Sequence, residues 1–159
     1  AVPADQCDAM KGVEELGLQP LLVGGVSRRE EELSRRIRDR ASAPVVDARK
    51  GDVRHLLWIL EGARLVISPD TGPLHMARAV ETPVVGLYGY TNPKRSGPYR
   101  MFQELTVDGY ARYPGEAYPI SPRKRKGGMS RISPGMVLEK VELALERYGR
   151  GRIGREKGI

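Results

Sequence analysis

The 159 residues contain 40% hydrophobic and 30% charged residues, enough apolar material for one hydrophobic core in a domain of ordinary size. No apolar run approaches the ~20 residues that a membrane helix needs, and no signal-peptide pattern stands at the start. The single cysteine, Cys7, excludes an intramolecular disulfide framework and fits a reducing compartment. Because globular sequence follows Ala1 at once, we expect this chain to be part of a longer protein.

The net charge of +7 is unevenly distributed along the chain. Basic and acidic residues balance over residues 1–119, and the whole excess of lysine and arginine lies in residues 120–159. This segment includes the run Arg123-Lys124-Arg125-Lys126. The distribution predicts a basic tail on a neutral domain, and it argues against a protein built throughout for nucleic acid.

The first third of the chain alternates predicted helices and strands. A helix over residues 8–18 ends near Gly17, and a short apolar strand over residues 21–23 ends at Gly24-Gly25. Ser27 is a helix N-cap candidate, and Glu30 three residues later completes a capping box.

A second strand over residues 44–47 precedes a helix that Asp52 caps and Gly62 ends. The side chains of that helix predicted to face the core are Val53, Leu56, Leu57 and Leu60. A strand at residues 65–67 follows and stops at the turn and cap residues of 68–72.

Pro73 suits the first turn of the next helix, which runs to about Val80, and a strand over residues 83–88 ends at Gly89. Residues 94–98 are predicted to form a loop, and a last short strand is expected at 104–107. The remaining predictions are an irregular loop at 110–128, a closing helix at 133–146 and a basic, disordered tail at 147–159.

This alternation predicts an α/β fold, a Rossmann-like doubly wound parallel sheet with helices on both faces. In such sheets ligands bind outside the carboxyl ends of the strands. The turns at residues 24–25, 70–72 and 89–91 all fall at that edge. We therefore expect one binding site there, formed by residues from all three turns.

The turn at residues 70–72 gives the clearest indication of a binding site. A strand that feeds a capped helix leaves backbone N–H groups and the positive helix end at one point, which favours an anion such as phosphate. Gly72 permits close approach of a ligand, and His75 adds a protonatable donor. Alternatively, Asp70 and Thr71 only cap the helix and His75 only packs.

The other candidates carry weaker signals. Gly24-Gly25 lacks the third glycine of a dinucleotide fingerprint and the lysine of a P-loop. Glu30 is either the capping-box partner or an acceptor for ribose hydroxyls, and both alternatives stay open. No nucleophile stands with a base, and no metal-ligand spacing is visible. The pattern therefore suggests a domain that holds a donor and lacks its own catalytic base.

The sequence resembles the carboxyl-terminal half of the family 9 glycosyltransferases, the lipopolysaccharide heptosyltransferases. The resemblance extends more weakly over most of residues 20–146, including Gly24-Gly25, Glu30 and residues 129–132. The stretches that carry it are Ser68-Pro69-Asp70-Thr71-Gly72-Pro73-Leu74-His75, Ala77, Ala79, Pro83, Leu87-Tyr88-Gly89-Tyr90-Thr91-Asn92-Pro93 and Gly97-Pro98-Tyr99.

This resemblance implies one half of a GT-B glycosyltransferase, which binds an ADP-sugar donor without a metal. Glu30, or Glu31 because of the wider spacing here, would reach the ribose. The implied donor-binding residues are Asp70, Thr71, Gly72, His75, Gly24, Gly25, Glu30, Gly89 and Thr91. The resemblance implies no catalytic residue in this chain, because the family's general base and acceptor site lie in an N-terminal domain absent here. A basic residue that faces phosphate in the family would precede Ala1.

The resemblance implies an inverting enzyme that transfers heptose from ADP-heptose to lipopolysaccharide core or a related glycan. Its partners would be the missing N-terminal domain and a lipid-linked saccharide acceptor, with no specific nucleic acid. We expect a cytoplasmic protein, and the basic tail either contacts anionic lipid at the inner face of the membrane or is simply solvated. The alternative function is a non-catalytic nucleotide- or phosphate-binding regulatory module.

Overall fold

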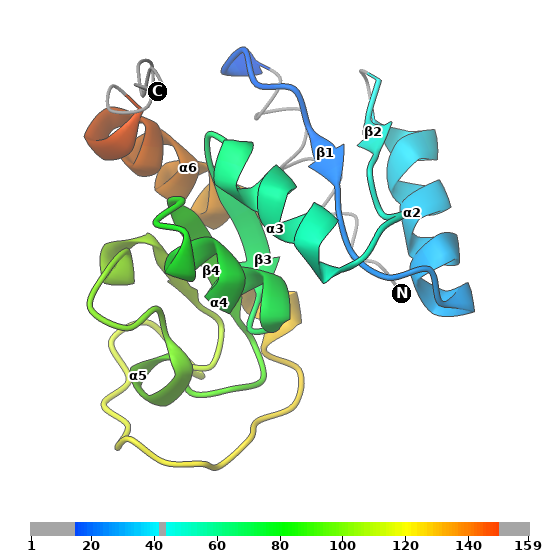
Figure 1. The fold of residues 1–159 in the computed structure, drawn as a ribbon. Coiled ribbons are helices and arrows are strands. Elements are labelled where there is room, and N and C mark those ends of the chain that lie inside the picture. The colour runs from blue at the N-terminus through cyan, green and yellow to red at the C-terminus, as the bar shows by residue number, and fades with distance from the viewer. Residues whose placement is uncertain (1–14, 42–43, 150–159) are drawn as a thin grey trace.

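A computed structural model describes residues 15–41 and 44–149 of the chain (Figure 1). Cys7, most of the predicted first helix and the last ten residues of the predicted tail lie outside the described residues. Gly17 has φ = +71°, the left-handed conformation that commonly ends a helix, directly after the short helical end at Glu15.

Strands and helices alternate along most of the described chain (Figure 1). The first half comprises β1 (Leu21–Leu22), α2 (Arg28–Arg40), β2 (Val46–Asp47), α3 (Val53–Gly62), β3 (Val66–Pro69) and α4 (Gly72–Ala79). The second half comprises β4 (Val84–Tyr88), α5 (Pro93–Ser96), the 3-10 turn η1 (Gln103–Leu105), β5 (Thr106–Asp108), the 3-10 turn η2 (Met129–Arg131) and α6 (Pro134–Tyr148). Residues 109–128 contain neither helix nor strand.

All the strand pairs are parallel, which confirms the predicted α/β class, but the described strands form two sheets instead of one. One sheet pairs β1 with β2, and the other has the order β3-β4-β5. The separation has a physical reason, because β1 and β2 are only two residues long. Leu21 and Val46 also stay about half exposed, at 47% and 48%, so these strands bury little apolar surface.

The core lies around β4, whose five residues are all buried. In Figure 1, α4 covers the near face of this sheet, α3 lies beside α4 and α6 lies behind the sheet. Leu74 and Ala77 of α4 and Val141 of α6 are almost completely inaccessible to solvent. Burial of this apolar surface is the main force that holds α4, and therefore the β3–α4 turn, in place.

The two predicted helix caps, Ser27 and Asp52, are confirmed, and Ser133 caps α6. Ser27 and Glu30 form the reciprocal capping box of α2, and Asp52 accepts a hydrogen bond from the His55 N–H at 2.8 Å. Ser133 accepts one from the Met136 N–H at 3.3 Å. These helices begin where the sequence places their caps because the cap side chains satisfy first-turn N–H groups.

The predicted inward face of α3 is partly wrong. Leu60 is buried and Leu56 packs against the core, but Val53 is 71% exposed and Leu57 also faces solvent. This helix packs at the edge of the sheet, against α4, so only the i, i+4 stripe of Leu56 and Leu60 is covered. Within the described residues, no helix is long and apolar enough to cross a bilayer.

Candidate functional site

The junction of β3 and α4 leaves the start of the helix without a side-chain cap. Thr71 occupies the N-cap position in extended conformation, but its side chain makes no cap hydrogen bond. Its hydroxyl donates instead to the Pro69 carbonyl at 3.2 Å. The Thr71 side chain therefore does not cap α4. The positive end of this helix stays available for an anion.

Asp70 lies at the centre of a cluster of polar side chains at this junction. Its carboxylate is only 12% exposed, and its Oδ1 lies 3.0 Å from Nε2 of His75. Burial by itself would raise the pKa of Asp70, but hydrogen bonds from Thr91, Ser96 and His75 outweigh it and lower the pKa. Asp70 is therefore an ionised carboxylate at neutral pH, held by side chains from α4, α5 and the turn after β4.

His75 combines a fixed position with access to solvent. Its side chain is 53% exposed, and among the described residues its hydrogen-bond partner is Asp70. A carboxylate that engages one ring nitrogen orients the imidazole and leaves the other nitrogen for a ligand. The alternative of a buried packing histidine is excluded by this exposure.

Open space lies beside Gly72, the first residue of α4. A Cβ atom built at this position would meet no other atom within 4 Å. A ligand can therefore approach the backbone of the first helical turn closely, as the sequence predicts for this glycine.

The turn after β4 completes the cluster with residues that the sequence analysis missed. Asn92 caps α5 by accepting a hydrogen bond from the Lys94 N–H at 3.0 Å, and this short helix brings Ser96 to Asp70. The prediction of a loop at residues 94–98 is thus wrong for its first half. The signal was present, because Asn92-Pro93 is an N-cap followed by proline at the first helical position.

Tyr88 lies beneath this cluster and was not predicted as part of the site. Its ring is fully buried, and its hydroxyl donates to the Ser96 carbonyl at 3.3 Å. Burial, and secondarily the charge of Asp70, raises the pKa of Tyr88. The tyrosine therefore stays protonated, and its hydroxyl holds the Ser96 backbone in place through this hydrogen bond.

Gly89 serves packing in this structure, whereas its neighbour Thr91 joins the Asp70 cluster. A Cβ at Gly89 would lie 2.7 Å from the Gly128 carbonyl carbon and against the Met129 backbone nitrogen. The glycine is needed because the chain before η2 crosses directly over the β4 turn. No open space at Gly89 is available for a ligand.

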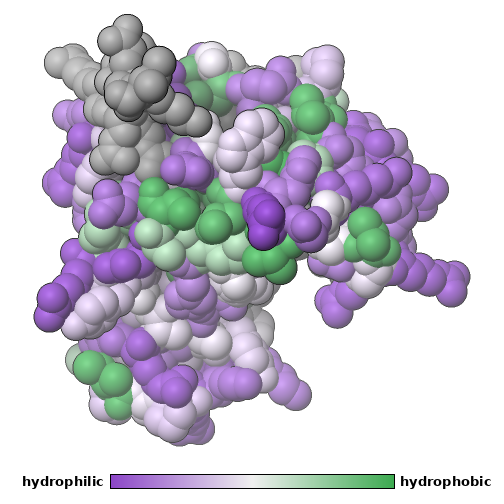
Figure 2. Space-filling model, viewed as in Figure 1, coloured by the Kyte–Doolittle hydropathy of each residue, from purple (hydrophilic) through white to green (hydrophobic). Residues whose placement is uncertain are grey.

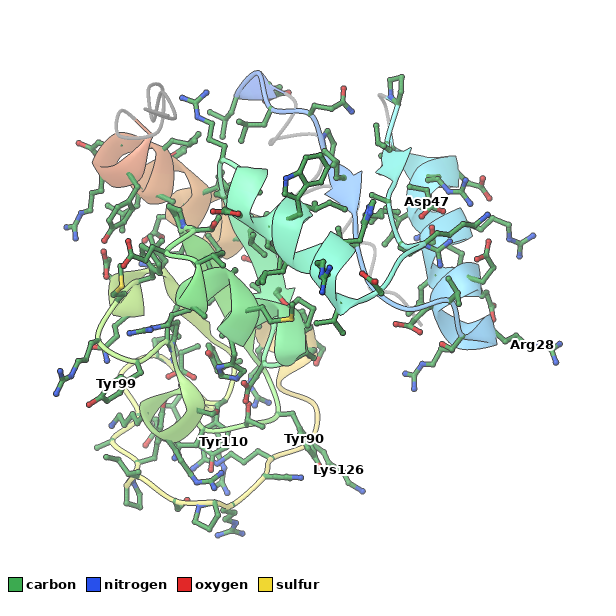
Figure 3. The ribbon with its side chains drawn as sticks, in the orientation of Figure 1. Arg28, Asp47, Tyr90, Tyr99, Tyr110 and Lys126 are labelled. Carbon is green, nitrogen blue, oxygen red and sulfur yellow. The ribbon has the colours of Figure 1, made fainter. Side chains whose placement is uncertain are left out.

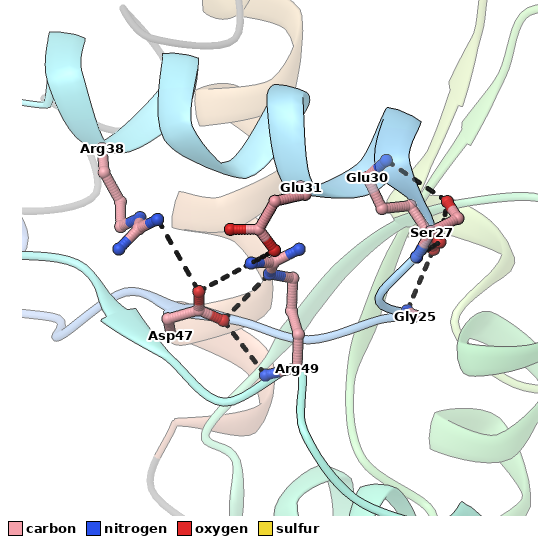
Figure 4. A network of polar contacts seen from close by, with 7 residues as sticks. All are labelled: Gly25, Ser27, Glu30, Glu31, Arg38, Asp47 and Arg49. Carbon is pink, nitrogen blue, oxygen red and sulfur yellow. Dashed lines mark hydrogen bonds and ion pairs between the residues drawn. The ribbon is translucent and has the colours of Figure 1, made fainter.

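The turn after β1 forms a local hydrogen-bonded unit of its own (Figure 4). Oε1 of Glu30 accepts from the Gly25 N–H at 2.9 Å, and Oε2 accepts from the Ser27 N–H at 3.2 Å. The Ser27 hydroxyl contributes most to the lowered pKa of Glu30. The capping role of Glu30 is thus present, and no hydrogen bond or ion pair between described residues joins this turn, including Gly24, to Asp70.

Glu31, the alternative ribose ligand, belongs to a second polar network (Figure 4). It accepts a hydrogen bond from Nη2 of Arg49 at 2.9 Å. Arg49 is also bound to Asp47, and its Nη1 is buried without a hydrogen-bond partner. These residues hold α2 against the end of β2.

Acid should weaken this network over a defined pH range. Hydrogen bonds from Arg49 lower the pKa of Asp47 from 3.8 to about 2. Because the pKa is lower in the folded state, the stabilisation is complete above pH ~4 and is lost as the pH falls towards 2. Urea midpoints measured between pH 5 and pH 2 should fall more steeply for the wild type than for Asp47→Asn. Equal slopes for the two proteins would contradict the pairing.

Comparison with known proteins identifies the family of this chain. A model of glycosyltransferase family 9 (heptosyltransferase) matches residues 9–114 of the chain. The chain belongs to glycosyltransferase family 9. It is 40% identical over 62 residues to a lipopolysaccharide core heptosyltransferase of Haemophilus influenzae, and 27% identical over 104 residues to lipooligosaccharide heptosyltransferase 2 of the same organism. These alignments cover 39% and 63% of this chain.

Two solved structures share the fold of this family 9 chain. A family 9 glycosyl transferase from Veillonella parvula superimposes with a TM-score of 0.71 at 22% identity, covering 92% of this chain. ADP-heptose lipopolysaccharide heptosyltransferase II of E. coli superimposes with a TM-score of 0.67 at 18% identity, covering 89% of this chain. The matched parts are only 43% and 40% of those chains, and 18% and 29% of the two curated relatives. The chain therefore corresponds to part of a GT-B heptosyltransferase structure.

Among the described residues, no group of three or more histidine, cysteine, aspartate or glutamate side chains gathers as metal ligands do. The site at the β3–α4 junction consists instead of one oriented histidine, one ionised carboxylate and an uncapped helix start. This set can bind an anion and donate hydrogen bonds to it.

Proposed function

We propose that this chain is the nucleotide-sugar donor-binding domain of an inverting glycosyltransferase. In this proposal the enzyme transfers heptose from ADP-heptose to lipopolysaccharide core or a related lipid-linked glycan. The relatives in E. coli and H. influenzae, an ADP-heptose lipopolysaccharide heptosyltransferase and two lipopolysaccharide or lipooligosaccharide heptosyltransferases, support the donor and the acceptor class. The acceptor site and the general base lie in another domain, which the larger size of the relatives supports.

The observation that carries the proposal is the open, uncapped start of α4 at Gly72 beside the Asp70–His75 pair. A diphosphate placed there meets the positive end of the helix and a histidine donor together. The donor-binding residues are then Asp70, Thr71, Gly72, His75 and Thr91, and Ser96 positions Asp70. Gly24 and Gly25 would contact the donor from the turn after β1, and Glu30 or Glu31 would reach its ribose.

In the proposed reaction, an acceptor hydroxyl oxygen forms a bond to the anomeric carbon. The bond from that carbon to the diphosphate oxygen breaks, and the hydroxyl proton passes to the base of the other domain. Negative charge builds on the leaving diphosphate, where the α4 N-terminus and His75 stabilise it. Because these groups supply the positive charge, we propose that no metal is required.

Calorimetry on Gly72→Ala tests the donor site. Wild-type protein should bind ADP and ADP-heptose more tightly than UDP-glucose, with or without a chelator. The added methyl group should weaken ADP binding at least about tenfold, a loss of ~1.4 kcal/mol. It should leave the melting temperature unchanged or slightly higher, since alanine suits a helix better than glycine.

Gly62→Ala is the matched control, because a Cβ at Gly62 also meets no atom within 4 Å. Absence of nucleotide binding at millimolar concentration, or equal ADP affinity in the two variants, would contradict the proposal. A transfer assay with the protein that also contains the acceptor domain separates the enzyme from a non-catalytic regulatory module. Only the enzyme releases ADP in an acceptor-dependent manner.

The cytoplasmic location and the membrane contact also remain proposals. The relatives named above act on lipopolysaccharide or lipooligosaccharide, which supports an acceptor at a membrane surface. The excess of lysine and arginine in residues 120–159 supports a contact of the basic tail with anionic lipid.

A further inference from the structure

The segment between β5 and α6, which includes η2, gathers six cationic side chains around one pocket of about 400 Å³. All of them come from this one segment, and the acidic side chains of the domain do not line the pocket. The lining residues are Arg112, Arg123, Lys124, Arg125, Lys126 and Arg131. We call this feature the basic pocket.

Most of the positive charge in the basic pocket is not neutralised. Arg125 forms an ion pair with Glu116 at 2.7 Å, and none of the other five lining cations forms an ion pair with a described residue. The second nearby carboxylate, Asp108, is engaged by the Tyr118 hydroxyl and the Ala111 N–H. Like charges that converge without counter-charges repel one another, and a bound anion relieves that repulsion.

The basic pocket rests on buried anchors that fix its backbone. Tyr110 is almost fully buried, and its hydroxyl donates to the Arg123 carbonyl at 2.8 Å. Arg125 stacks over the Tyr110 ring at 4.3 Å and donates to the Tyr110 carbonyl at 2.9 Å. Nε of Arg125 is buried without a hydrogen-bond partner. A segment held in this way keeps its cations together before a ligand arrives, which lowers the entropic cost of binding.

The basic pocket lies beside the turn that follows β4. The Arg125 N–H donates to the Tyr90 carbonyl at 3.0 Å, and Nζ of Lys124 lies 5.4 Å from the Tyr90 ring centre. Figure 3 shows Tyr90, Tyr110 and Lys126 on the same part of the molecule, and Figure 2 shows a mainly hydrophilic surface there. No lining residue belongs to the Asp70 cluster, so the basic pocket is a second site next to the candidate donor site.

We propose that the basic pocket binds a phosphate-bearing anion, separate from the nucleotide-sugar donor. Its volume falls within the roughly 300–1,000 Å³ of small-ligand sites, but its lining is cationic rather than apolar. Arginine and lysine are the side chains that recognise phosphate oxygens through charge-assisted hydrogen bonds. The inference goes beyond the proposed function and does not depend on it.

Calorimetry with inorganic pyrophosphate, at constant ionic strength and with saturating ADP present, tests this site. Wild-type protein should bind one pyrophosphate per chain. The triple variant Arg123→Ala/Lys124→Ala/Lys126→Ala should bind it at least about tenfold more weakly, and it should keep its melting temperature because these side chains form no ion pairs with described residues. The matched control replaces three exposed arginines outside the pocket, Arg35→Ala/Arg40→Ala/Arg54→Ala. Its affinity for pyrophosphate should stay within about twofold of the wild-type affinity.

Equal weakening in both triple variants would overturn the proposal, because the effect would then be one of net charge. Absence of pyrophosphate binding, or full displacement of pyrophosphate by ADP, would overturn it as well. Pyrophosphate binding in a protein that binds no ADP would leave the basic pocket standing and remove the proposed donor function. The two failures are therefore distinguishable.

Vesicles of phosphatidylglycerol, compared with phosphatidylcholine, distinguish two sources of the phosphate once pyrophosphate binding is established. Loss of phosphatidylglycerol binding in the pocket variant alone assigns the phosphate to a lipid headgroup. Unchanged vesicle binding in that variant assigns it to a soluble or saccharide-linked phosphate.

Discussion

Replacing His75 with alanine is expected to slow sugar transfer by the full-length protein roughly 100- to 1,000-fold, as loss of a donor to developing negative charge does elsewhere. The reason is that the imidazole is held by Asp70 at 3.0 Å and remains half exposed at the uncapped start of α4. In the proposed reaction it donates to the leaving diphosphate as an imidazolium, because its Nε2–H is already donated to Asp70. Steady-state turnover with ADP-heptose measures the effect.

Because the His75 side chain is exposed, truncating it should leave the melting temperature unchanged. A loss of rate can then be separated from a loss of stability. His75→Gln, which keeps a hydrogen-bond donor, should recover part of the rate. Exposed His55 on α3 provides the control, since His55→Ala should turn over at the wild-type rate. A His75→Ala enzyme that is folded and fully active would show that the histidine does not act on the diphosphate.

Replacing Gly89 with alanine should destabilise the domain by about 1–3 kcal/mol, the usual cost of forcing a methyl group into packed structure. The added Cβ would lie 2.7 Å from the Gly128 carbonyl carbon, and backbone cannot move aside as a flexible side chain can. For a chain of this size the melting temperature should fall by roughly 2–4 °C for each kcal/mol. Thermal unfolding followed by circular dichroism measures this change.

Gly89→Ala should also displace the segment that carries the basic pocket, because that segment crosses the β4 turn at Gly128. Pyrophosphate binding is then expected to weaken along with stability. The control is Gly62→Ala, where the methyl group enters open space and stability should be kept. A Gly89→Ala protein as stable as the Gly62→Ala protein would contradict the packing described here.

The sequence was sufficient to predict the elements whose signals are local. Ser27 with Glu30, and Asp52, cap helices as predicted, because a cap depends only on residues three positions apart. The β3–α4 junction was predicted for the same reason, since an apolar run, a polar turn and Pro73 follow one another directly. The hydrogen bond between Asp70 and His75 is also local, but it was not predicted.

Features that depend on contacts between distant segments were not predictable. The packing role of Gly89 comes from Gly128, and the ordered basic pocket comes from Tyr110 beneath the run of cations. The exposure of Val53 depends on where α3 meets α4, which periodicity alone does not reveal. The division into two sheets depends on strand lengths that a single sequence does not fix.

The most direct test of the central claim is an amide chemical-shift titration of the isotope-labelled protein with ADP. A donor diphosphate at the start of α4 predicts the largest shifts at Thr71, Gly72, His75 and Thr91, and smaller shifts at the turn of residues 24–25. Amides around Arg125 should move little at ADP concentrations that saturate the first set. Shifts confined to residues 110–131, with none at Gly72 or His75, would contradict the account.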